Sequence, residues 1–153
     1  MSSQSIPNQF LNKEFIETSA TGCDEYMALK GMPWLVRKLV CRTLTKGYFK
    51  IIPEEIEGVY KIELGISKNR NSYSFRLNEA LEDIGYDMKK HKIVFTFEND
   101  KLIERHIHLE GDREGDSDDI FYWYFDSQGI LTSECFFEKN GVTKTWIRKL
   151  QPE

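Results

Sequence analysis

After its first third, the chain consists of short segments in which apolar and polar residues alternate with a period of two. In residues 59–66, for example, Ile62 and Leu64 fall on one face of an extended strand, whereas Lys61 and Glu63 fall on the other. The same alternation predicts strands over residues 72–77, 92–97, 102–109, 119–125, 130–137 and 142–150.

Turn-forming residues separate these segments at regular intervals. Residues 98–100, 126–129 and 138–141 are rich in Asn, Asp and Gly, which tolerate the left-handed backbone of tight turns. Short strands joined in sequence by tight turns indicate an all-β antiparallel meander, and closing such a meander into a barrel removes its exposed edges. We therefore expect a barrel.

One stretch, residues 23–41, is predicted to be helical. Gly31 and Pro33 stand in its middle, and since Gly ends helices well and Pro begins them well, the stretch is expected to form two short helices in a hairpin. This helical hairpin follows a first strand predicted over residues 13–18.

Composition limits the classes of function. The chain has 153 residues, the length of one domain, and its 40% hydrophobic and 13% aromatic content is typical of a folded protein. A net charge of -4 gives no support to a nucleic-acid-binding surface. No run approaches the roughly 20 apolar residues that a membrane helix needs.

The cysteines and the N-terminus predict a cytoplasmic protein. Cys23, Cys41 and Cys135 are widely spaced and odd in number, so we expect neither a disulfide framework nor a CxxC metal or redox site. The first residues lack both the basic and the apolar parts of a secretory signal.

Residues 23–32, with the sequence Cys-Asp-Glu-Tyr-Met-Ala-Leu-Lys-Gly-Met, are followed by Arg37 and Lys38. They resemble the helical lid of the fatty-acid-binding protein family, whose members carry Asn-Phe-Asp-x-Tyr-Met, then Gly, then Arg-Lys. The resemblance extends through Ser-Phe-x-Leu at 74–77 and Lys-x-Lys at 90–92 to the closing strand. It covers about residues 11–150.

This resemblance implies a ten-stranded antiparallel up-and-down barrel of the calycin type with a two-helix lid. Residues 11–150 would form the lipid-binding barrel, with an N-terminal extension at 1–10 and a tail at 151–153. The implied protein is a monomeric, non-enzymatic intracellular carrier of one long-chain fatty acid or similar hydrophobic molecule, without a cofactor. It would be cytoplasmic, with the nucleus as a second compartment, and would contact membranes transiently through its lid. A retinoid-binding protein and an interaction protein with a filled interior remain as alternatives.

The closing strand departs from the family pattern. There the family ordinarily presents Arg-x-Tyr inward to hold a carboxylate, and alignment places Trp146 and Arg148 at these two positions. A second inward Arg is common in the family, but no Arg lies between Glu114 and Ile147. We predict that Trp146 and Arg148 face the ligand, and the alternative of a solvated Arg148 at the barrel rim stays open.

The resemblance also implies further contacts and a portal. We expect the portal to involve the lid helices and the turns at residues 67–71 and 83–88. Simple packing of the lid on the barrel is the alternative for the individual side chains. The predicted ligand-facing or portal residues are Tyr26, Met27, Met32, Trp34 and Val40 in the lid and Phe75 in the barrel.

Other chemistry finds little support. His106 and His108 share one strand face, as in half of a metal site, but no suitable ligand follows them, and His91 comes earlier in the chain. The acidic run at 110–119 lacks the spacing of a calcium loop and is expected to be a solvated loop. We therefore expect neither a metal site nor a catalytic site.

Overall fold

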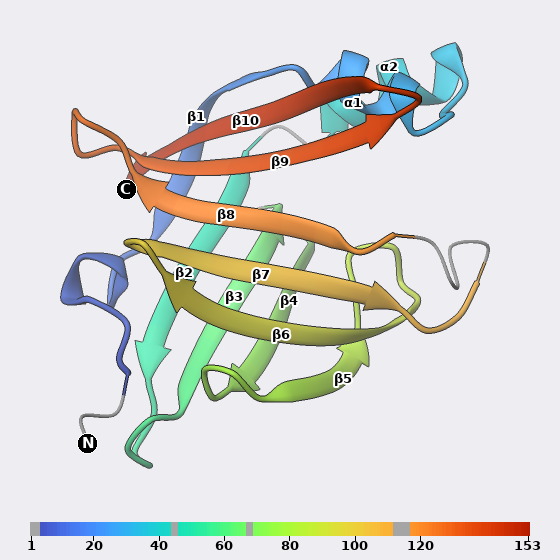
Figure 1. The fold of residues 1–153 in the computed structure, drawn as a ribbon. Helices are drawn as coiled ribbons and strands as arrows, with labels where there is room; N and C mark the ends of the chain where they lie inside the picture. The colour runs from blue at the N-terminus through green and yellow to red at the C-terminus, as the bar shows by residue number, and fades with distance from the viewer. Residues whose placement is uncertain (1–3, 44–45, 67–68, 112–116) are drawn as a thin grey trace.

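The computed structural model describes residues 4–43, 46–66, 69–111 and 117–153, which form ten strands, two α-helices and one short 3-10 helix (Figure 1). The centre of the acidic run, residues 112–116, lies outside the described part of the chain. None of the described helices is long and apolar enough to cross a membrane. The elements are η1 (Asn8–Phe10), β1 (Phe15–Thr21), α1 (Cys23–Leu29), α2 (Trp34–Thr43), β2 (Gly47–Pro53), β3 (Tyr60–Ile66), β4 (Asn69–Phe75), β5 (Ala80–Ile84), β6 (Lys90–Glu98), β7 (Lys101–His108), β8 (Asp119–Phe125), β9 (Leu131–Lys139) and β10 (Val142–Pro152).

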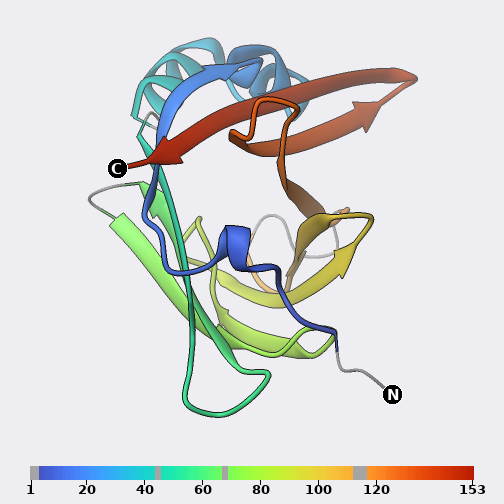
Figure 2. The same cartoon turned by 90° about the vertical axis from the view of Figure 1, so that its left-hand side faces the viewer.

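All ten strands belong to one antiparallel sheet, in the order β4-β3-β2-β1-β10-β9-β8-β7-β6-β5. The sheet curls into a nearly closed barrel in which β4 and β5 are the two end strands (Figures 1 and 2). The hydroxyl group of Tyr73 on β4 donates a hydrogen bond to the carbonyl oxygen of Ile84 on β5 at 2.7 Å, which bridges this seam. The predicted ten-stranded barrel with two helices after the first strand is confirmed.

The predicted tight turns explain the hairpin register. Asn99 and Asp100 have φ values of 52° and 62° between β6 and β7, and Asn140 and Gly141 have values of 52° and 78° between β9 and β10. Asn, Asp and Gly adopt this left-handed backbone at low cost. The sequence patterns predicted neither β2 nor β5; β5 is a short edge strand that is largely exposed and lacks apolar alternation.

The first strand begins at Phe15 and continues to Thr21, later at both ends than predicted. It does so because Thr21 still pairs with Ile147 on β10, while Asn12 breaks the extended backbone with a φ of 61°. Its first residues pair with both β2 and β10, so this strand joins the two halves of the sheet.

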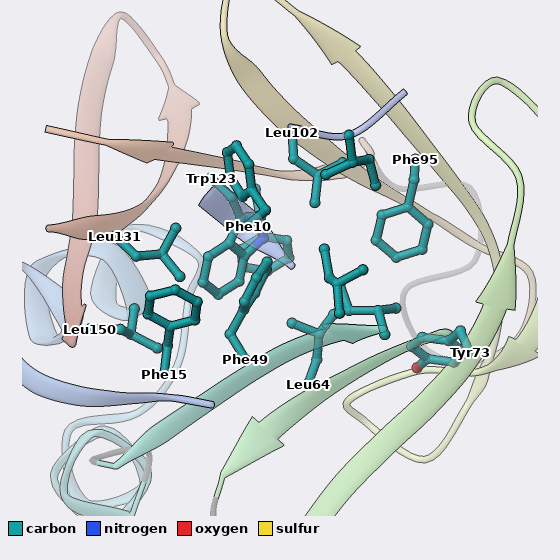
Figure 3. Close-up of a cluster of buried hydrophobic side chains, with 14 of the residues drawn as sticks. Phe10, Phe15, Phe49, Leu64, Tyr73, Phe95, Leu102, Trp123, Leu131 and Leu150 are labelled. Carbon is teal, nitrogen blue, oxygen red and sulfur yellow. The ribbon is translucent and has the colours of Figure 1, made fainter. Parts of the chain in front are cut away.

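The interior at one end of the barrel is an aromatic core. The N-terminal segment crosses this end (Figure 2), and the ring of Phe10 packs 5.9 Å from Phe97 and 4.8 Å from Phe125. Figure 3 shows Phe15 and Phe49 pointing into the same cluster. Rings at these distances in edge-to-face arrangements gain more than area burial alone.

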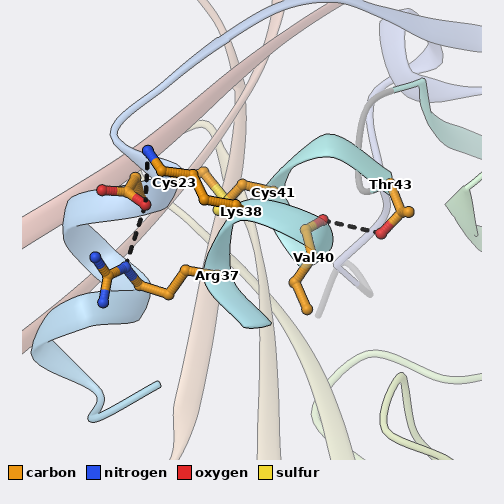
Figure 4. Close-up of a disulfide and its surroundings, with 7 residues drawn as sticks. Cys23, Arg37, Lys38, Val40, Cys41 and Thr43 are labelled. Atoms are coloured by element: carbon orange, nitrogen blue, oxygen red, sulfur yellow. Dashed lines mark hydrogen bonds and ion pairs between the residues drawn. A yellow bond between two sulfur atoms is a disulfide. The ribbon is translucent and has the colours of Figure 1, made fainter. Parts of the chain in front are cut away.

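A disulfide joins the two helices. Cys23 at the start of α1 bonds to Cys41 near the end of α2, with their Cα atoms 5.9 Å apart (Figure 4). The expectation of no disulfide was wrong, because the helical hairpin brings the first and last turns of the lid together. Helix α2 buries none of its residues, and Arg37 and Lys38 form ion pairs with Asp24 of α1 at 3.1 and 3.8 Å.

Candidate functional site

The structure places Trp146 and Arg148 on the inner face of β10, where the predicted register puts them. Trp146 and Leu150, two residues to either side of Arg148, are both buried. The Arg148 guanidinium carbon lies 4.7 Å from the Trp146 ring centroid and 5.5 Å from that of Trp123. Its Nη2 donates to Ser133 Oγ at 3.3 Å. Arg148 therefore presents a cation to an aromatic part of the interior.

Acidic groups balance this cation. Burial lowers the pKa of the Arg148 guanidinium, and Glu17 and Glu104 oppose the shift. Burial likewise raises the pKa of the Glu17 carboxyl group, against the attraction of Arg148. The guanidinium stays charged, since an unperturbed Arg loses its proton only above about pH 12. Glu17 is the acid in this group that burial biases toward the neutral form.

The indole of Trp146 offers a second donor. Its Nε1 is buried and has no hydrogen-bond partner among the described residues. Buried N–H groups are nearly always satisfied by protein, water or ligand. The ring of Tyr26 lies 5.9 Å from that of Trp146, and the Tyr26 hydroxyl group is 3.0 Å from Cys135 Sγ. The predicted residues Tyr26, Trp146 and Arg148 thus meet beneath α1.

The remaining predicted residues lie elsewhere. Phe75 is buried with its ring centroid 5.7 Å from Tyr60 and 4.3 Å from Phe95, within the apolar core. Met27 is partly buried against that core. Met32 is half-buried, and its carbonyl oxygen accepts a hydrogen bond from Arg37.

The outer lid residues point away from the barrel. Trp34 is 62% exposed, and its neighbours Leu35 and Leu39 are 73% and 65% exposed. Val40 is half-buried, and its carbonyl oxygen accepts a hydrogen bond from Thr43 Oγ1 (Figure 4). Trp34 and Val40 therefore lie on the surface of the lid, and no residue of α2 reaches the buried interior.

A polar cluster that the sequence analysis did not predict fills another part of the interior. His91, His106 and His108 are all buried, and β6 pairs with β7 so that His91 stands opposite His108. A signal was present in the sequence. Counting outward from the turn at Asn99 and Asp100 pairs residue 91 with residue 108. The sequence placed His91 earlier in the chain than His106 and His108, and the hairpin register brings it opposite His108.

Glu104 links this cluster to the Arg148 side. Its Oε1 accepts the indole N–H of Trp123 at 3.0 Å, and its Oε2 lies 2.5 Å from His106 Nε2. The Nδ1 atoms of His106 and His91 are 2.9 Å apart. A continuous chain of polar contacts therefore runs through the barrel.

Asp87 and Asp119 complete the cluster. His91 Nε2 lies 2.8 Å from Asp87 Oδ1, and His108 Nε2 lies 2.9 Å from Asp119 Oδ2. Burial lowers the pKa of His91, against the attraction of Asp87. The ligand atoms of Asp87, His91 and His108 all lie within 4.8 Å of one another, close enough to hold a metal ion.

Asp119 connects the lid to the barrel. Its Oδ1 forms a 2.5 Å ion pair with Lys30 at the end of α1, and its Oδ2 accepts a hydrogen bond from Tyr86 in the β5–β6 turn. Burial disfavours the charged carboxylate, but Lys30 and the hydrogen bonds from Tyr86 and His108 outweigh burial and lower the Asp119 pKa to about 2. The buried Asp119 carboxylate on β8 thus contacts both the lid and the predicted portal turn.

No model of a known protein family matches the chain. Among curated proteins, fatty acid-binding protein homolog 1 of Caenorhabditis elegans is 32% identical over 138 residues, which cover 90% of this chain and 82% of that protein. Homolog 3 of the same organism is 30% identical and covers 94% of this chain and 84% of that protein. Homolog 4 is 29% identical and covers 96% and 98%.

Solved structures share the fold. An extracellular fatty acid binding protein, As-p18, superposes with a TM-score of 0.81 at 20% identity and covers 98% of this chain and all of that one. Apo lipid binding protein 8 of Caenorhabditis elegans has a TM-score of 0.70 at 19% identity and covers 95% and 96%. At this level of identity the likeness supports the barrel with its helical lid.

Proposed function

The chain belongs to the fatty acid-binding protein family, and we propose that it carries one long-chain fatty acid or a similar hydrophobic molecule in its barrel. The family consists of non-enzymatic lipid binders, so binding and release are the whole activity. The observation that supports an internal ligand most directly is the buried Trp146 N–H, which has no acceptor in the described part of the chain and lies beside the Arg148 guanidinium.

In the proposed complex, the fatty acid carboxylate accepts hydrogen bonds from Arg148 and from Trp146 Nε1. A charge-assisted bond of this kind contributes about 1.5–3 kcal/mol. The acyl chain lies against apolar side chains of the interior, where each buried CH2 group adds about 0.8 kcal/mol. The ring of Tyr26 packs beside the head group beneath α1.

A neutral head group is the second candidate. Glu17 and Glu104 already offset the charge of Arg148, which disfavours a further anion at this place. A hydroxyl-bearing ligand such as a retinoid would accept the Trp146 N–H without adding a negative charge. The third candidate, an interaction protein with a filled interior, predicts that no lipid binds.

The exposed surface of α2 suits transient membrane contact. Trp34, Leu35 and Leu39 present apolar side chains to solvent, and Lys38 lies 5.8 Å from the Trp34 ring. Apolar and basic side chains together favour the surface of an anionic bilayer. We include transfer of the ligand to membranes through this helix in the proposal.

The compartment is proposed from two opposing features. The resemblance of the lid to that of intracellular carriers favours the cytoplasm, whereas the disulfide between Cys23 and Cys41 favours an oxidising compartment, where such bonds persist. Thiol titration of protein isolated from its native source under alkylating conditions distinguishes them. One free thiol per chain indicates an oxidising compartment, and three indicate the cytoplasm.

Ligand binding is tested by native mass spectrometry of the purified protein, lipid extraction, and titration with fluorescent fatty acid and retinol probes. Arg148→Gln is expected to weaken fatty acid binding about 10- to 150-fold, the equivalent of one charge-assisted bond. Arg105→Gln is the matched control, because Arg105 is exposed and pairs with Asp118 outside the site.

The outcomes separate the three candidates. Loss of fatty acid affinity in Arg148→Gln, with retention in Arg105→Gln, supports the carboxylate site. Unchanged fatty acid affinity in Arg148→Gln removes Arg148 from the site. Tight retinol binding with weak fatty acid binding supports the neutral head group, and failure to bind either probe supports the filled interior.

A further inference from the structure

The polar cluster around His91 contains more hydrogen-bond contacts than protons to occupy them. Three short contacts join four groups in a row: Glu104 to His106, His106 to His91, and His91 to Asp87, at 2.5, 2.9 and 2.8 Å. Each contact needs one proton between its two atoms. Two neutral imidazoles supply two protons, and two carboxylates supply none. One contact therefore needs a further positive charge, carried by a proton or by a metal ion.

His108 distinguishes between these two sources of charge. Its side chain is buried, its Nε2 is bonded to Asp119 at 2.9 Å, and its Nδ1 has no hydrogen-bond partner among the described residues. That Nδ1 lies 3.9 Å from Asp87 Oδ2, on the other oxygen of the carboxylate that meets His91. A proton on His91 leaves His108 Nδ1 unsatisfied, whereas a metal ion between the three residues satisfies both.

We propose that Asp87, His91 and His108 form a binding site for a divalent transition-metal ion of the zinc type. The ligand atoms would be a carboxylate oxygen of Asp87, Nε2 of His91 and Nδ1 of His108. Zinc binds such atoms at about 2.0–2.2 Å in a tetrahedron, so its ligand atoms lie about 3.4 Å apart. The observed separations, all within 4.8 Å, require only small side-chain movements. Solvent supplies the fourth ligand.

The surrounding residues orient both imidazoles for this role. Asp119, ion-paired with Lys30, accepts a hydrogen bond from the Nε2–H group of His108, which leaves the Nδ1 lone pair free to face the site. In the same way His106 accepts a hydrogen bond from the Nδ1–H group of His91, which leaves Nε2 of His91 free to bind metal. Partners of this kind fix the tautomer and the ring orientation of metal-binding histidines.

The backbone makes room for the site, and solvent can reach it. A Cβ atom at Gly85 would lie 2.1 Å from His91 Nδ1, so only glycine allows the imidazole its place. Asp87 in the β5–β6 turn has a side chain that is 29% exposed, while those of His91 and His108 are fully buried. The ion would therefore approach from the turn, past Asp87.

Isothermal titration of the metal-free, oxidised chain with Zn²⁺ tests the proposal. We expect one ion per chain, and Asp87→Asn should weaken binding at least about 100-fold, more than loss of an outer partner usually costs. Asp83→Asn, a change of the same kind at an exposed residue of β5, is the matched control and should leave binding unchanged.

Spectroscopy of the unaltered chain gives a readout that does not depend on variants. Bound Co²⁺ should show the absorption of a tetrahedral site, and Zn²⁺ should shift the nitrogen resonances of His91 Nε2 and His108 Nδ1. Absence of binding at millimolar Zn²⁺, equal binding by Asp87→Asn and Asp83→Asn, or unmoved His91 and His108 resonances would each overturn the proposal.

Discussion

Replacing both cysteines of the lid by serine should destabilise the protein by an amount that follows from the size of the disulfide loop. Cys23 and Cys41 are 18 positions apart. Closing a loop of that size in the unfolded chain lowers its entropy enough to contribute about 3 kcal/mol to the free energy of unfolding at 25 °C. Among the described residues, the ion pairs of Asp24 with Arg37 and Lys38 also connect the helices, and ion pairs near the surface contribute about 0–1 kcal/mol each.

The loss should also appear locally in α2. Because α2 buries none of its residues, the disulfide is expected to be a main constraint that holds it to α1. In Cys23→Ser/Cys41→Ser we expect the free energy of unfolding to fall by about 3 kcal/mol, and the amides of residues 34–43 to exchange faster. The barrel amides of β6 and β7 should keep their relative protection.

Urea unfolding followed by tryptophan fluorescence, combined with hydrogen exchange, checks both effects. A thiol reductant should lower the midpoint of the unaltered protein to that of the double variant, and it should leave the variant itself unchanged. The reasoning is refuted if the free energy of unfolding falls by less than about 1 kcal/mol, against the 3 expected, and the exchange of α2 stays the same.

Three further predictions concern single residues. Asp119 has a pKa of about 2 against an ordinary 3.8, so it contributes about 2 kcal/mol to the free energy of unfolding above pH 4. This contribution is lost as the pH falls toward 2. Asp119→Asn should abolish this acid-dependent part of the stability, measured by urea unfolding at several pH values. Gly22→Ala should cost about 1–3 kcal/mol, measured by thermal unfolding, since Gly22 has a φ of 85° and a Cβ would lie 2.0 Å from Thr145 O. Phe49→Ala should cost about 3–5 kcal/mol because Phe49 is fully buried, and the same change at Phe136, which is 49% exposed, should cost far less in the same assay.

Two contacts that were not predicted could have been predicted from the sequence. The turn at Asn99 and Asp100 defines the register of its hairpin, so His91 opposite His108 follows from counting. The predicted helical hairpin is symmetric about residue 32, which places Cys23 near Cys41. Both contacts were missed because each residue was compared with patterns of spacing along the chain and not with its partner across a hairpin.

The sequence by itself determined most of the strands, the tight turns, the two lid helices and the shared strand face of Trp146 and Arg148, because alternation and turn chemistry act over a few residues. Only the tertiary structure decided which inward side chains meet. The ion pair between Lys30 and Asp119 joins residues 89 positions apart, from α1 to β8. Such contacts depend on how the sheet closes and how the lid lies on it, and strand periodicity carries no information on either.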